Sequence, residues 1–163
     1  MSSIDLSTTL NHQVRLAARP VGLPTDADWQ HTAEPVTPPG AGGVVVKTLA
    51  LSLDPAMRGW MNDGRSYIPP VGIGEVMRAG GVGVVVASDS PGFALGTYVS
   101  GGLGVQEYCT IPGEQLRKSG LSRIDLRLGT LTQWLNVLGM PGMTAYFGLL
   151  DVGEPQPGQT VVV

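Results

Sequence analysis

The chain has 163 residues, of which 42% are hydrophobic and 14% charged, enough for a packed core in about one domain. Its net charge of −3 excludes a general nucleic-acid binder, which would carry a basic face. The 24 glycines and 13 prolines favour a turn-rich β architecture over a helical bundle.

The cysteine count and the apolar segments indicate in which cellular compartment the chain is expected. Cys109 is the single cysteine, so an internal disulfide is impossible and a cytoplasmic setting is expected. The first ten residues lack the basic and apolar regions of a secretory leader. No run of about 18 apolar residues occurs, so we expect no membrane span.

Five short strands are expected in the first two thirds of the chain. Each is an apolar or β-branched run bounded by glycine or proline: 13–19, 44–54, 80–88, 97–100 and 105–111. Gly83, inside the third run, indicates a bulge or a close backbone approach. Between these runs, the five prolines of 20–43 leave little regular structure beyond short edge strands.

The pattern changes to helical after about residue 120. Leu131, Trp134, Leu135 and Leu138 have helical spacing, with Thr130 placed as the N-cap. Pro141 suits the first turn of a second helix, which is expected to run to about Leu150.

An apolar strand over 160–163 is predicted to follow the two helices. This order of elements indicates a small β-barrel followed by the opening of a β-α-β unit. We expect the valines 161–163 to pack on the chain's own helices or on a neighbouring molecule.

Local motifs predict neither a metal site nor a catalytic residue. His12, His31 and Cys109 do not have the spacing of metal ligands, and no nucleophile motif is present. The segment 72–81, GIGEVMRAGG, lacks the third glycine of a dinucleotide fingerprint and leads into a strand, whereas a phosphate cradle needs a helix behind it.

The irregular segment 55–75 concentrates bulky side chains, as functional loops often do. Met57, Trp60, Met61 and Tyr67 either cap the barrel as core residues or line an apolar pocket for a flat ligand. Arg58 among them is either a solvated charge or an anion contact, and its neighbours do not decide.

Several stretches taken together resemble one family. They are VRLAARPVGLPT (14–25), ALSLDPAMRGWM (50–61), GGVGVVVAS (80–88), GVQEY (104–108) and LGMPGMTAYFGLLDVGEPQPGQTVVV (138–163). In this order they are similar to the zinc-independent medium-chain dehydrogenase/reductases, in the branch of the leukotriene/prostaglandin reductases and alkenal double-bond reductases.

The resemblance implies a mainly β fold with a few helices. Residues 1–128 would form a GroES-like, partly open β-barrel on the substrate side. Residues 129–163 would supply connecting helices and the first strand of an NADP-binding Rossmann domain whose remainder is missing. In the family a later segment returns to the first domain, and most of the NADPH site would lie beyond residue 163.

The resemblance also implies a reaction, in which hydride passes from NADPH to the C=C bond of an α,β-unsaturated ketone or aldehyde. The isolated chain is expected to be inactive, and a homodimer is compatible with it. Two alternatives stay open: a stand-alone GroES-like binding or assembly module, and a quinone reductase of the same superfamily.

Carried over position by position, the resemblance implies contacts for six residues. The nicotinamide end of the cofactor would contact Pro55, Ala56, Met57, Met140 and Thr144, and the substrate would contact Tyr67. Ala56 departs from the family, because many relatives have tyrosine there, and this smaller side chain implies a wider pocket or a different substrate.

Overall fold

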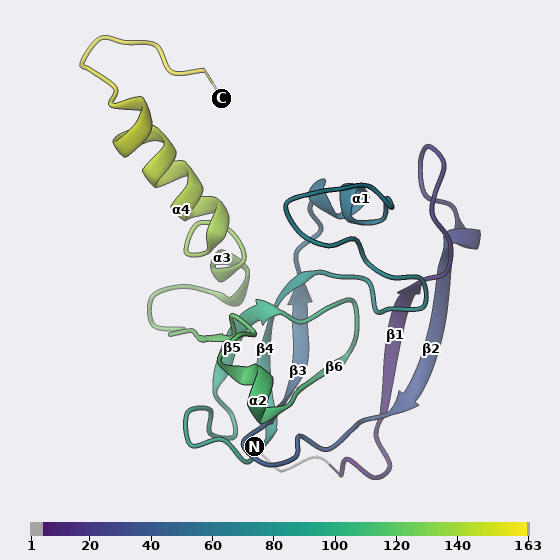
Figure 1. Cartoon of the computed structure of the whole chain (residues 1–163). Helices are drawn as coiled ribbons and strands as arrows, with labels where there is room; N and C mark the ends of the chain where they lie inside the picture. Colours follow the sequence, from purple (N-terminus) through teal and green to yellow (C-terminus); the bar gives the residue numbers. More distant parts are fainter. Residues whose placement is uncertain (1–4, 163) are drawn as a thin grey trace.

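The structure is a computed structural model that describes residues 5–162. Its strands are β1 (Leu10–Leu16), β2 (Trp29–Pro35), β3 (Val44–Leu51), β4 (Gly80–Ser88), β5 (Tyr98–Gly102), β6 (Tyr108–Ile111) and β7 (Ser122–Arg123). The helices are α1 (Ala56–Trp60), α2 (Gly113–Leu116), α3 (Leu131–Trp134) and α4 (Met140–Phe147), with a 3-10 turn η1 (Asp26–Asp28) and a π-helical turn η2 (Gly148–Gly153). The fold is therefore mainly β with a few helices, as predicted (Figure 1).

Two antiparallel sheets form a barrel that is not closed. The larger sheet has the order β6-β3-β4-β5-β7, and β1 pairs with β2 alone. Backbone hydrogen bonds join β1 to the rest: Val14 N–H donates to Val105 O at 2.9 Å, and Met77 N–H donates to Val14 O at 2.8 Å. These bonds confirm the partly open barrel, in which β1 and β2 stand beside the larger sheet (Figure 1).

Alternating apolar residues of the strands build two core clusters. The first fills the larger sheet and consists of Val44, Val46, Val85, Val99, Leu103, Cys109 and Ile111, all buried. The second lies under α1 and consists of Leu16, Met61, Val71 and Met77. Because β-branched side chains pack well on a pleated surface, the valine runs of the sequence became the central strands.

At Gly83 the strands β3 and β4 approach closely. A Cβ atom there would lie 2.4 Å from Lys47 O and 2.6 Å from Val46 Cγ1. Thr48 pairs with Gly83 and Ala50 pairs with Val82, so Leu49 is an extra residue in β3. Both the bulge and the close approach predicted from Gly83 are confirmed.

The helical region is more broken than its spacing predicted. Thr130 caps α3 as expected: its Oγ1 accepts from Gln133 N–H at 3.4 Å, and its own N–H donates to Gln133 Oε1 at 2.8 Å. The helix nevertheless ends at Trp134, after one turn, and not near Leu138. α4 ends at Phe147 and continues as the π-helical turn η2.

The strand predicted at the end of the chain is wrong for residues 160–162, which lie outside any strand. A strand needs a neighbouring strand for its backbone hydrogen bonds, and α4 carries this segment away from both sheets (Figure 1). Val161 is 53% and Val162 90% exposed, so packing on the chain's own helices is also wrong for them; Val163 lies outside the described residues.

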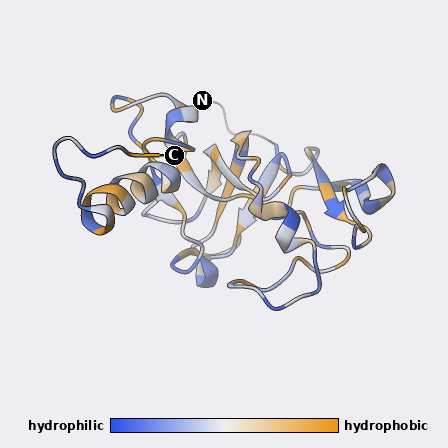
Figure 2. Ribbon diagram, turned by 90° about the horizontal axis from the view of Figure 1, so that it is seen from above, coloured by the Kyte–Doolittle hydropathy of each residue, from blue (hydrophilic) through white to orange (hydrophobic). Residues whose placement is uncertain are grey.

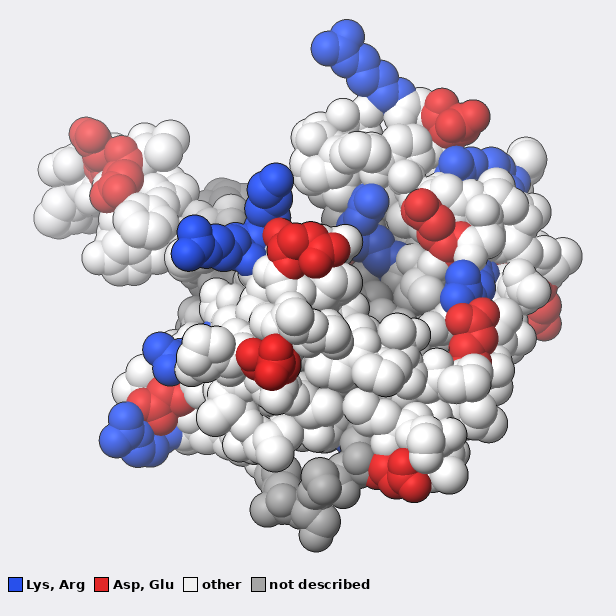
Figure 3. Space-filling model, turned by 60° about the horizontal axis from the view of Figure 1, so that its bottom comes forward, with Lys and Arg blue, Asp and Glu red and all other residues white. Residues whose placement is uncertain are grey.

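Apolar side chains are exposed along the same projecting region. Met143, Tyr146 and Phe147 of α4 and Val152 of η2 are each more than half exposed. In Figure 2 the ribbon of this helix carries hydrophobic colouring alongside hydrophilic segments. Across residues 5–162, no helix is long and apolar enough to cross a membrane. On the face drawn in Figure 3, acidic and basic side chains are interspersed and form no continuous basic stripe.

Gly83→Ala should lower the free energy of unfolding by about 1–3 kcal/mol, because the new methyl group forces β3 and β4 apart. The matched control is Gly102→Ala in β5, where no atom lies within 4 Å of the added Cβ. Urea unfolding of both variants measures the difference. Equal stability of the two variants would show that the close approach carries no constraint.

Cys109 predicts a loss of stability at alkaline pH. Burial raises the pKa of its thiol from 9.0 to about 11, so the folded chain holds this proton more tightly than the unfolded chain. The contribution of this buried, protonated thiol to the free energy of unfolding is fully present below about pH 9. It is lost as the pH rises to about 11, and the loss is at most about 2–3 kcal/mol. Urea unfolding at about pH 8 and pH 11 should show a smaller loss in Cys109→Ala than in the wild type, and equal losses would contradict the assignment.

Candidate functional site

A cleft of about 410 Å³ lies where the larger sheet meets the α3–α4 junction. Its walls come from the segment between β3 and α1, from Trp60 of α1, from the start of β4 with the two residues before it, from the end of β5, from Gly120 before β7, and from α3, the α3–α4 turn and the start of α4. The cleft thus gathers segments that are far apart in the sequence. One of the six candidate contact residues, Met140, lines it, together with Trp60.

The floor of the cleft is made by glycines that face each other across two strands. Gly80 of β4 pairs with Gly102 of β5, and Gly81 pairs with Gly101. Cβ atoms at Gly80 and Gly102 would meet open space or only a distant Ser52 Cβ. At Gly80 and Gly102 the sheet backbone is therefore open to a ligand, and a flat group can approach it closely. Cβ atoms at Gly81 and Gly101 would instead meet Leu103 and Leu121.

The walls combine apolar surface with few polar groups, as small-molecule sites do. Trp60, Leu135 and Met140 supply the apolar area, while Asp54 and Arg78 supply one charge of each sign. Trp134, in the wall made by α3, has a buried Nε1 with no partner among the described residues. Such a donor costs about 1–3 kcal/mol when it is left unpaired.

α1 is held beside the cleft by an arginine. Arg58 Nη2 donates to Pro20 O at 3.0 Å and Nε donates to Gly22 O at 3.0 Å, while Nη1 donates to Asn62 Oδ1 at 2.7 Å. Arg58 is therefore not simply a solvated charge, one of the two alternatives drawn from the sequence; the other, an anion contact, stays a prediction. Arg58 ties α1 to the loop before β2, and this loop lies more than 30 positions away in the chain.

The bulky side chains of 55–75 divide between the two predicted roles. Met61 belongs to the core, and Met57 packs against the same cluster. Trp60 packs there too, but it also lines the cleft. Tyr67 does neither: it is 77% exposed, and its hydroxyl accepts a hydrogen bond from Trp60 Nε1 at 3.0 Å.

Of the six residues implied as contacts, Met140 stands in the cleft wall. Thr144 follows one turn later on α4, and its Oγ1 donates to Met140 O at 2.8 Å. Pro55 and Ala56 are exposed at the start of α1, directly after the cleft residue Asp54. Of the six candidates, therefore, Met140 alone lines the cleft, and Pro55, Ala56 and Thr144 follow lining residues in the chain.

Sequence reasoning missed Arg78, the basic residue of the cleft wall. It stands inside the stretch GIGEVMRAGG, where the glycine spacing is the only feature that resembles a motif. Its contact with Trp60 joins positions 18 residues apart through the fold. No local pattern carries such a signal.

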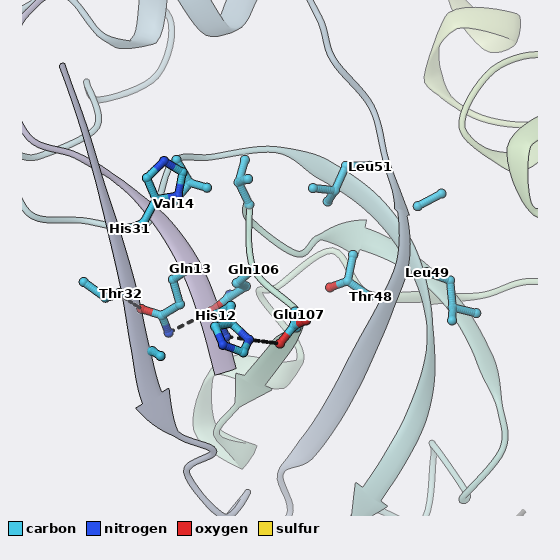
Figure 4. A pocket seen from close by; sticks show the side chains of 13 residues that line it. His12, Gln13, Val14, His31, Thr32, Thr48, Leu49, Leu51, Gln106 and Glu107 are labelled. Carbon is cyan, nitrogen blue, oxygen red and sulfur yellow. Dashed lines mark hydrogen bonds and ion pairs between the residues drawn. The ribbon is translucent and has the colours of Figure 1, made fainter. Parts of the chain in front are cut away.

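A second groove of about 620 Å³ runs between β1–β2 and β3 (Figure 4). Its rim carries His12, whose Nδ1 lies 2.7 Å from Glu107 Oε2; hydrogen bonds from His12 lower the pKa of Glu107. In Figure 4, His31 points from β2 toward the same groove, away from this pair.

Within residues 5–162 no three His, Cys, Asp or Glu residues are grouped to hold a metal ion. None of the six implied contact residues lines this groove, so we place the site in the cleft.

The chain belongs to the family described as the N-terminal domain of oxidoreductase, which matches residues 12–119. This membership confirms the family predicted from the sequence motifs. The relatives of the chain and a solved structure make the class more specific.

The chain is 45% identical to the NADPH-dependent curcumin reductase of Escherichia coli (strain K12) over 157 residues, which are 94% of this chain and 43% of that protein. It is 37% identical to the 2-alkenal reductase (NADP(+)-dependent) of Nicotiana tabacum over 158 residues, 94% of this chain and 45% of that protein. The crystal structure of CurA in complex with NADPH from Vibrio vulnificus superposes with a TM-score of 0.76 at 37% identity, covering 91% of this chain and 42% of that one. The chain therefore spans less than half the length of these relatives.

Arg58→Ala should lower the free energy of unfolding by about 1–3 kcal/mol, because three carbonyl or amide oxygens lose a charged donor. Arg65→Ala is the control, since Arg65 is exposed on the loop after α1 and no side-chain hydrogen bond is recorded for it in the described chain. Urea unfolding measures both variants. If Arg58→Ala lowers the free energy of unfolding by less than about 0.5 kcal/mol, as an ordinary surface substitution does, then Arg58 does not hold α1 in place.

Proposed function

We propose that this chain forms the substrate-side part of an NADPH-dependent reductase acting on the C=C bond of α,β-unsaturated ketones and aldehydes. One observation carries the proposal: the cleft brings α4, with Met140, against Asp54 and Trp60 over a glycine floor. Proteins similar to this chain over nearly its whole length are NADP-dependent reductases. The family and the cleft therefore support the same chemistry.

The cleft fits the flat nicotinamide end of such a cofactor. Its glycine floor lets a planar ring lie on the sheet backbone, and Trp60, Leu135 and Met140 offer apolar walls. When bound, NADPH supplies the hydride. The proposed cofactor contacts are Pro55, Ala56, Met57, Met140 and Thr144, and the proposed substrate contact is Tyr67. The proposed cofactor contacts are supported by their place in or directly before α1 and in α4. Tyr67 is supported by its hydrogen bond with Trp60, which lines the cleft.

The chain's own residues would bind and orient the enone. The apolar walls exclude water from the reacting carbons, and the hydroxyls of Ser52 and Ser100 are donors that can hold the carbonyl oxygen as it gains negative charge. The β-carbon would gain the hydride and the α-carbon a proton that comes ultimately from solvent water, so the C=C bond becomes a single bond and NADPH leaves as NADP+. Such a reaction requires no metal ligand, since hydrogen-bond donors take the place of a Lewis acid.

The proposal divides the chain into a GroES-like domain, 1–128, and a connecting part, 129–163, that leads into a cofactor domain. The exposed apolar side chains of α4, among them Met143 and Tyr146, support this division, because a following domain would cover them. A homodimer and a cytoplasmic setting belong to the same proposal. The single cysteine supports that setting.

Two other functions, a stand-alone binding module and a quinone reductase, can be distinguished from the proposed one by experiment. A stand-alone binding module would use the groove between β1–β2 and β3, and it would need no cofactor. A quinone reductase of the same superfamily would use the same cleft with another acceptor. The reductase of enones is favoured because a similar protein is a 2-alkenal reductase.

The test is a chain continued through a cofactor domain and assayed for NADPH consumption with a panel of enones, alkenals and quinones. We expect turnover with enones or alkenals that exceeds turnover with quinones. A folded protein that binds NADPH but reduces none of the enones or alkenals would contradict the proposal. The 163-residue chain serves as the control, and calorimetry should show no micromolar affinity for NADPH.

A further inference from the structure

Arg78 is a cation fixed at the cleft in a defined orientation. It stands between Met77 and Ala79, which are both 1% exposed, so the backbone on either side is anchored in the core. Its Cζ lies 5.4 Å from the centroid of the Trp60 ring, and Nη1 donates to Pro69 O at 3.0 Å. A guanidinium held on an aromatic face has lost much of the freedom that it would otherwise lose on binding a ligand.

This cation has no carboxylate partner in residues 5–162. The recorded ion pairs use His12, Arg15, Arg19 and Arg127 as their basic members. A guanidinium has five N–H donors, and Pro69 O is the one protein acceptor recorded for Arg78 in this part of the chain. Donors of Arg78 are therefore available to a ligand in the cleft.

Carboxylate is the anion that this arrangement fits best. The planar fork of arginine matches the two oxygens of a carboxylate, and each such bond is charge-assisted. Dinucleotide phosphates, by contrast, are bound where a glycine turn enters a helix, and Arg78 stands before a strand. Asp54, the acidic residue of the wall, forms no recorded ion pair with Arg78 within residues 5–162 and leaves the cation free for the ligand.

We propose that Arg78 is a specificity-determining residue that binds a carboxylate carried by the substrate, so that the cleft favours enones bearing a carboxylate over neutral ones. The inference rests on the proposed reductase function, but it concerns binding and can fail independently. Trp60 reports the event, because its ring lies under the guanidinium and its Nε1–H is held by Tyr67.

The experiment titrates the 163-residue chain with benzoylpropanoate, a saturated aryl keto acid, and with its methyl ester. NMR follows the indole N–H resonance of Trp60. We expect the wild type to bind the acid about three- to tenfold more tightly than the ester. Arg78→Met, whose side chain still covers the Trp60 ring, should bind both equally, and Arg78→Lys should keep part of the preference because it keeps the charge but loses the fork.

Two controls separate a direct contact of Arg78 from a change in net charge and from unfolding of the cleft. Arg65→Met removes one positive charge from an exposed loop and should leave the preference for the acid unchanged. Unchanged ester binding in Arg78→Met shows that the cleft is still folded. The proposal is overturned if acid and ester bind the wild type alike, if Arg65→Met abolishes the preference, or if Arg78→Met weakens the acid and the ester equally.

The source of the anion is tested with inorganic phosphate and NADPH as competing probes. If either one shifts the Trp60 resonance in the wild type but not in Arg78→Met, and displaces the acid, then Arg78 serves a cofactor phosphate and the proposal is wrong. Absence of turnover in a longer chain would leave these binding results unchanged, so failure of the reductase function and failure of this inference are distinguishable.

Discussion

The pairing of β3 with β4 sets the position of the cleft. At Gly83 the two strands approach so closely that no side chain fits between them, and this contact defines their register. β3 then leads to Asp54 and α1, while β4 begins at the glycine floor with Arg78 just before it. A one-residue slip in a strand turns every side chain to the other face, so this register decides which residues reach the site.

The cleft is defined as much by missing side chains as by those present. Gly80 of β4 and Gly102 of β5 leave the sheet without side chains there, and the bulky residues stand at the edges, on α1 and at the α3–α4 turn. A flat ligand would be bounded laterally by Trp60, Leu135 and Met140. The helices α3 and α4 make few contacts with the sheet and expose apolar surface, as is typical of regions of low local stability.

Features with a local physical cause were predictable from the sequence. The valine runs became central strands, Gly83 marked the close approach, and Thr130 capped α3. The resemblance to a family pointed to residues of α1 and α4, and one of them, Met140, lines the cleft. The ligand contacts that the resemblance implies for Pro55, Ala56, Met57, Met140, Thr144 and Tyr67 stay predictions. A ligand contact depends on residues from both walls of a site, and the relatives are more than twice as long as this chain.

Features that depend on distant partners were not predictable in the same way. Arg58 reaches carbonyls more than 30 positions earlier, and Arg78 meets Trp60 only through the fold. The apolar residues 160–162 have the composition of a strand, but strand formation requires a neighbour, and none lies beside them within residues 5–162.

The two arginines show how one residue type takes opposite roles around a single helix. Arg58 uses donors of all three of its guanidinium nitrogens on backbone and amide oxygens of the protein, so it holds α1 in place. Arg78 uses one recorded donor on Pro69 O and rests its guanidinium group beside Trp60. The first arginine fixes the wall of the cleft, and this rigidity lets the second act on the ligand, because a cation recognises an anion well only when its own support does not move.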